Sequence, residues 1–148
     1  MATGIIEVAL SYVLKNAKGR DAKCFTKGPA FSSLPEPTIS ITSLDCGDTN
    51  STMPVEYTHD GSGRFPTLEW SAPDNLAPLV KEWLLVCEDP DAPLPTPICH
   101  GIYGGINKTR LEPADFEFEV DKKALLKGGF YYGKSRGSTV YLPPRPLM

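Results

Sequence analysis

Residues 82–93 read EWLLVCEDPDAP and residues 98–106 read ICHGIYGGI, and these two stretches decide the fold. The continuous apolar run at residues 83–86 is typical of a strand that is covered on both faces. The second stretch is another apolar run, lightened by Gly101, Gly104 and Gly105, and glycines inside a strand often mark a bulge or a close backbone approach. The sequence therefore predicts two strands joined by a proline-rich turn.

Shorter strands are expected on both sides of this pair. Ile39 and Ile41 alternate with polar residues, Leu68 and Trp70 alternate across the next segment, and residues 116–120 form another alternating piece. Turn-forming clusters separate these segments, namely DCGDTNST at residues 45–52 and HDGSG at residues 59–63.

The chain has 148 residues, of which 15 are proline and 13 are glycine. Proline interrupts helices and central strands, which argues against a helical bundle. The sequence thus predicts a mainly β fold with few short helical turns.

One longer helix is expected at residues 4–18. Its apolar residues recur at spacings of three and four, which places them on one helical face. These residues are Ile5, Ile6, Ala9, Leu10, Val13 and Leu14. The polar face carries too few cations for a helix that lies on a membrane surface, so we interpret it as a helix that packs on the edge of the domain.

Charge and cysteine usage exclude several classes of protein. The formal net charge of −3 offers no general attraction to nucleic acid or to an acidic membrane. The cysteines have no CxxC spacing, so no structural zinc site or other metal is expected, and a domain of this size does not need disulfides. We therefore expect free thiols at Cys24, Cys46, Cys87 and Cys99.

Targeting and membrane-spanning signals are not expected either. The first apolar run, residues 4–14, contains Glu7, has no basic residue before it and is too short to span a bilayer. The sequence therefore predicts a cytoplasmic protein without integral membrane association.

The turn between the two long strands holds the strongest chemical signal. Residues two apart on an extended backbone face the same side, and Pro90 favours extended geometry at the residue before it. Asp89 and Asp91 are therefore expected to converge at a strand end, where one carboxyl group would keep its proton or recruit a cation. His100, at the start of the next strand, can supply that positive charge.

The same residues have simpler interpretations. Asp-Pro-Asp is also good turn chemistry, because Asp caps turns and Pro presets their geometry. A metal site at Asp89, Asp91 and His100 would need more ligands than the local sequence offers. His59 is expected to be a loop residue. No nucleophile–base motif such as GxSxG or HExxH occurs, which favours a binding protein over an enzyme.

The order of several motifs resembles the phosphatidylethanolamine-binding protein family, which includes Raf kinase inhibitor proteins, and the chain is most similar to a fungal-type member. The motifs are PEPTISITSL at residues 35–44, MPVEYTHDG at 53–61, PTLEWSAP at 66–73, EWLLVCEDPDAP at 82–93 and CHGIYGGI at 99–106. The resemblance implies a β-sandwich built around a large antiparallel sheet, with a small anion-binding pocket. It also implies that Asp89, Asp91 and His100 line the pocket, that Pro93 shapes its rim, and that Tyr141 begins a second motif block.

The chain departs from the family pattern at two places. It ends at residues 146–148, before the Gly-x-His-Arg-Tyr element of the second block, so we expect a single domain over residues 1–148 whose β core, residues 35–148, lacks that element. The segment before His100 reads LPTPIC, without the aromatic and basic residues of the animal members.

Three functions follow as hypotheses. The first is a cofactor-free binding or regulatory protein for a phosphate-bearing or other anionic small molecule, including a phospholipid head group. The second is an enzyme of the same fold that acts on a small organic substrate by Asp/His acid–base chemistry. The third is an inhibitor module whose partner is a kinase or a protease. A gene neighbourhood devoted to biosynthesis would favour the enzyme.

Overall fold

The computed structural model describes residues 19–34, 36–92, 94–120, 122–137 and 139–145. The predicted helix at residues 4–18 and the predicted pocket residue Pro93 lie outside the described residues. Among the residues described, no helix is long and apolar enough to cross a membrane.

The described chain is mainly β, as predicted, and its helical elements are all short 3-10 turns. The strands are β1 (Ile41–Thr42), β2 (Leu68–Trp70), β3 (Trp83–Asp89), β4 (Ile98–Ile106), β5 (Arg110–Leu111) and β6 (Tyr131–Tyr132). The 3-10 turns are η1 (Asp21–Lys23), η2 (Phe25–Lys27), η3 (Pro29–Phe31), η4 (Val55–Tyr57), η5 (Ala77–Leu79) and η6 (Pro113–Phe116).

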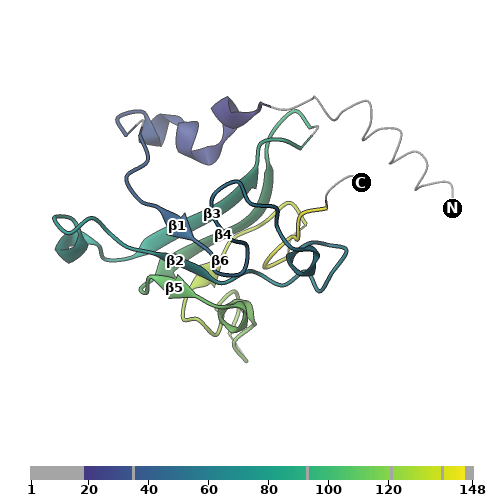
Figure 1. Ribbon diagram of the computed structural model, residues 1–148. Helices are drawn as coiled ribbons and strands as arrows, with labels where there is room; N and C mark the ends of the chain where they lie inside the picture. Colours follow the sequence, from purple (N-terminus) through teal and green to yellow (C-terminus); the bar gives the residue numbers. More distant parts are fainter. Residues whose placement is uncertain (1–18, 35, 93, 121, 138, 146–148) are drawn as a thin grey trace, which may run out of the picture.

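The strands form two antiparallel sheets, with orders β1-β2-β5 and β3-β4-β6. Figure 1 shows β3 and β4 as the two long neighbouring strands of the molecule. The described residues form two antiparallel sheets of three strands each, which is consistent with the fold that the resemblance implied. The other four strands are only two or three residues long, because turns and 3-10 segments interrupt the chain on either side of them.

The predicted strand at residues 98–106 coincides with β4, and the predicted strand at residues 83–86 is the first half of β3. β3 continues to Asp89 because Glu88 and Asp89 pair with the start of β4. The expectation that this strand is covered on both faces is wrong at one position. Leu85 is 8% exposed and faces the core, whereas Leu84 is 55% exposed on the other face.

The hydrophobic core joins residues of both sheets and is rich in aromatic side chains. Trp70 of β2 packs edge-on against Trp83 of β3, with ring centroids 6.0 Å apart. The segment after β5 adds Phe116, whose ring stacks on Phe65 at 3.9 Å. The side chains that are fully buried are Tyr103, Ile106, Leu111, Leu126 and Phe130.

Tyr103 of β4 occupies the centre of this core. Its ring makes edge contacts with Phe65, Phe116 and Phe130, and its hydroxyl group donates a 2.8 Å hydrogen bond to the Val140 carbonyl. The ring also lies over Gly101, because residues two apart on a strand share a face. A Cβ atom at Gly101 would lie 2.6 Å from Cζ of Tyr103. Only glycine therefore leaves room for the tyrosine ring at this position.

Burial also controls the ionisation of this region. It raises the pKa of the Cys87 thiol to about 11, with the nearby Cys99 as a smaller cause. Burial likewise raises the pKa of the Tyr103 and Tyr141 hydroxyl groups above their ordinary value. All three groups are therefore held in their neutral forms in the folded protein.

We predict that Gly101→Ala destabilises the protein by about 1–3 kcal/mol, because the new methyl group displaces a ring that has no free space. The matched control is Gly104→Ala on the same strand, where the nearest atom to the new Cβ, Leu84 Cδ1, lies at 3.9 Å. That control should change the free energy of unfolding by less than about 1 kcal/mol. Urea denaturation of both variants measures the difference, and equal stabilities would contradict this account of Tyr103.

We predict that stability falls as the pH rises above about 9, because Cys87, Tyr103 and Tyr141 lose protons more readily in the unfolded chain. For each group the folded pKa is raised, so the unfolded state binds fewer protons in this window and the slope of stability against pH is negative. Cys87→Ala removes one of these groups, and its stability should fall less steeply between about pH 7 and about pH 10 than that of the wild type. Denaturant titrations across this range measure both slopes, and parallel curves would refute the role of Cys87.

Candidate functional site

The two aspartates of the DPD turn both accept hydrogen bonds from the backbone. Asp89 Oδ1 accepts a 2.8 Å hydrogen bond from the amide of Asp91, which is an Asx turn that sets the path of the chain after β3. Asp91 Oδ1 accepts a longer one, 3.4 Å, from the amide of Gly19. The Asp89 side chain is half-buried and Asp91 is exposed. Turn chemistry thus accounts for Asp89, and Asp91 keeps most of its capacity to accept hydrogen bonds.

His100 lies near the start of β4, the strand that follows this turn, and is 5% exposed. Its ring nitrogen Nδ1 lies 2.6 Å from the Leu142 carbonyl oxygen, and the Leu142 amide donates to the His100 carbonyl at 2.8 Å. A carbonyl oxygen only accepts, so Nδ1 carries the hydrogen of the neutral ring. The other nitrogen, Nε2, is buried and has no hydrogen-bonding partner among the described residues.

A buried polar atom without a partner is a costly feature, and such atoms are uncommon in folded proteins. With Nδ1 donating to Leu142, Nε2 holds a lone pair in the neutral ring and becomes a donor in the protonated ring. The imidazole of His100 therefore has one ring nitrogen whose hydrogen-bonding capacity the described residues do not use.

Tyr141 lies directly before Leu142, the residue whose carbonyl oxygen contacts the His100 ring. Its ring, however, is partly buried and packs against the core, edge-on to Phe65 at 4.8 Å. Within the described ranges, no hydrogen bond or ion pair joins His100 to Asp89 or Asp91. The described residues also contain no group of three or more His, Cys, Asp and Glu side chains that could hold a metal ion.

The segment that contains η1 and η2 binds the turn between β3 and β4. The Arg20 amide donates to the Pro90 carbonyl at 3.2 Å, and its Nε donates to the Leu94 carbonyl at 2.9 Å. Lys23 Nζ donates to the Pro95 carbonyl at 2.6 Å. We call residues 19–27 the strap. These contacts span 70 or more positions in the sequence, and no local pattern pointed to them.

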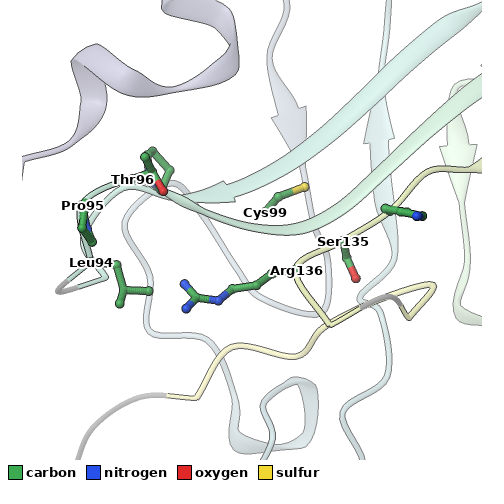
Figure 2. A pocket seen from close by; sticks show the side chains of 8 residues that line it. Leu94, Pro95, Thr96, Cys99, Ser135 and Arg136 are labelled. Carbon is green, nitrogen blue, oxygen red and sulfur yellow. The ribbon is translucent and has the colours of Figure 1, made fainter.

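A cavity of about 480 Å³ lies beside this turn. Its walls are the turn between β3 and β4 and the segment that follows β6, and Figure 2 shows the Arg136 side chain extending toward Leu94. The lining residues are Leu94, Pro95, Thr96, Pro97, Cys99, Lys134, Ser135 and Arg136. Of the predicted site residues that the structure describes, none lines this cavity. The only sequence signal for it is the basic pair in GKSRG at residues 133–137.

The cavity carries positive charge. Lys134 and Arg136 are exposed, and neither forms an ion pair with another described residue. Burial raises the pKa of the Cys99 thiol, so this lining group is neutral near pH 7. No acidic side chain is among the lining residues.

The comparisons with known proteins agree on one family. The family model described as phosphatidylethanolamine-binding protein matches residues 43–147. The chain is 43% identical over 146 residues to the "Phomoidride biosynthesis cluster protein B" of a fungal species (strain ATCC 74256), and the match covers 96% of this chain and 69% of the relative. The protein of the same name from Talaromyces stipitatus is 42% identical over 146 residues, which cover 95% of this chain and 59% of the relative.

The chain thus spans about two thirds or less of the length of these relatives. No solved structure gives a significant match. The family match covers more than half of the chain, including both long strands, the DPD turn and His100, and it agrees with the mainly β fold and its antiparallel sheets. The chain therefore belongs to the phosphatidylethanolamine-binding protein family.

Proposed function

We propose that this protein binds a small anionic molecule, such as a phosphate-bearing compound or a phospholipid head group, at the end of the β3–β4 strand pair. The observation that supports this most strongly is the buried, unpartnered Nε2 of His100. Leaving such an atom without a partner costs about 1–3 kcal/mol, and a ligand oxygen at Nε2 would recover that cost. A protonated imidazole bound to an anion forms a charge-assisted hydrogen bond, which is stronger than a neutral one.

The remaining predicted residues have consistent roles in this proposal. Asp91 is exposed and makes one long hydrogen bond to the other described residues, so its carboxylate is available to an amine group on the ligand. Asp89 and Pro93 would shape the turn around it. Tyr141 would support the position of Leu142, and so of the His100 ring, from the core.

The test uses His100→Asn, because the Asn side-chain amide can replace the Nδ1 donor toward Leu142 while it removes Nε2. We expect the affinity for inorganic phosphate and phosphoethanolamine, measured by calorimetry, to fall about tenfold or more. The control is His59→Asn, since His59 is the other histidine of the chain and lies exposed in a loop.

The two imidazole signals in the NMR spectrum provide a second measurement. We expect the His100 signal to shift on addition of either probe and the His59 signal to stay in place. Equal affinities for the two variants, or a shift confined to His59, would refute the proposal.

A second candidate function is catalysis on a small organic substrate, and the names of the relatives favour it because they refer to a biosynthesis cluster. His100 suits this chemistry, since the fixed Nδ1 hydrogen leaves the Nε2 lone pair free to act as a general base. The same atom would then move a proton instead of holding an anion.

Mass spectrometry separates the two functions. The protein is incubated with the small-molecule extract of Talaromyces stipitatus, the source of one relative, and the compounds are compared before and after. A compound consumed by the wild type, with a rate lowered about 10²–10⁴-fold in His100→Asn, would establish acid–base catalysis. A compound that is retained by the protein but not converted would establish binding alone.

A further inference from the structure

We propose that the cavity between the β3–β4 turn and the segment after β6 is a separate subsite for an oxyanion carried on an apolar body, with Arg136 as its principal cation. This subsite is independent of the function proposed above. Cys99 lines the cavity and His100 does not, and successive side chains on a strand point to opposite faces. The cavity and the His100 ring therefore lie on different sides of β4.

The cavity offers several hydrogen-bond donors that the described protein does not use. The guanidinium group of Arg136 and the ammonium group of Lys134 have no ion-pair partner among the described residues. Neither the amide nor the hydroxyl group of Thr96 is hydrogen-bonded to another described residue. The guanidinium fork matches the two oxygens of a carboxylate or a phosphate.

The segment that carries Arg136 is fixed in place. Ser135 is buried, and its hydroxyl group donates to the Thr139 carbonyl at 2.9 Å. The Arg136 amide donates to the Cys99 carbonyl at 3.1 Å, and the Gly133 amide donates to Ile102 at 2.8 Å. The base of the Arg136 side chain therefore has a fixed position relative to β4, which lowers the entropic cost of binding.

The opposite wall is fixed by the strap. Arg20 and Lys23 of the strap donate to the Leu94 and Pro95 carbonyls. These bonds add positive charge next to the cavity and occupy two carbonyl oxygens that would otherwise repel an anion.

The acidic groups of this region are engaged elsewhere. Glu88 Oε2 accepts a 2.7 Å hydrogen bond from the Phe25 amide, and Asp89 accepts one from the Asp91 amide. Glu88 still contributes to raising the pKa of the Cys99 thiol, so its negative charge reaches the cavity, where the two cations Lys134 and Arg136 outnumber it. The overall charge of −3 makes such a basic cavity a local feature and not a consequence of composition.

The lining also indicates what carries the oxyanion. Leu94, Pro95 and Pro97 supply an apolar wall, and small-molecule sites combine such walls with a few placed polar groups. The volume of about 480 Å³ is sufficient for a ligand larger than a bare ion. A carboxylic acid or a phosphate monoester with an apolar chain fits both requirements.

The experiment titrates the protein with hexanoate, with hexyl phosphate and with neutral hexanol, and follows backbone amides by NMR. We expect both anions to shift the amides of Thr96, Cys99 and Arg136, and hexanol to bind about tenfold more weakly or not at all. The anion that binds with the higher affinity shows whether the site favours a carboxylate or a phosphate. No shift at these amides with either anion would overturn the proposal.

The variant Arg136→Gln should weaken anion binding about tenfold, and Arg136→Lys should have a smaller effect, because it keeps the charge without the fork. Lys123→Gln is the matched control, since it removes one exposed charge outside the cavity. Binding that survives in Arg136→Gln and is lost in His100→Asn belongs to the His100 site and overturns this subsite. Loss in both Arg136→Gln and Lys123→Gln shows a general charge effect and overturns it as well.

Discussion

The hydrogen bond from the Tyr103 hydroxyl group to the Val140 carbonyl is the interaction on which the rest of the structure depends. It places a polar group in the middle of an aromatic core and satisfies it with the backbone of a segment that has no regular secondary structure. That segment is thereby held against β4, where Leu142 meets His100. Gly101 makes the arrangement possible, since no other residue leaves room for the ring.

The end of the β3–β4 pair presents two chemically different environments. On one side, a buried imidazole is held by a carbonyl and has one open nitrogen. On the other side, exposed cations face an apolar wall that the strap holds in place. The first environment suits proton transfer or one strong hydrogen bond, and the second suits charge recognition. A single ligand with an acidic group and a reactive group would have to pass around β4 to contact the His100 ring and the basic cavity at the same time.

The sequence was sufficient for the strands whose apolar pattern is continuous, because β3 and β4 are defined by local composition. It was insufficient where burial depends on distant segments: Leu84 belongs to an apolar run and is nevertheless exposed. The DPD turn and His100 could be selected from local chemistry, and the comparisons match them to a family. Arg136 could not be selected in this way. It lies beside Cys99 because its backbone amide donates a hydrogen bond to the Cys99 carbonyl, 37 positions earlier in the sequence.

The strap binds the turn through main-chain carbonyl oxygens, and the family match begins only at residue 43, after the strap has ended. Contacts of this kind restrict the path and the length of the turn but do not depend on the identity of its side chains. Residues 94–97 can therefore diverge between relatives while the turn keeps its shape. In evolutionary terms, the strap makes this wall of the cavity a position where ligand preference can change at little cost to the fold.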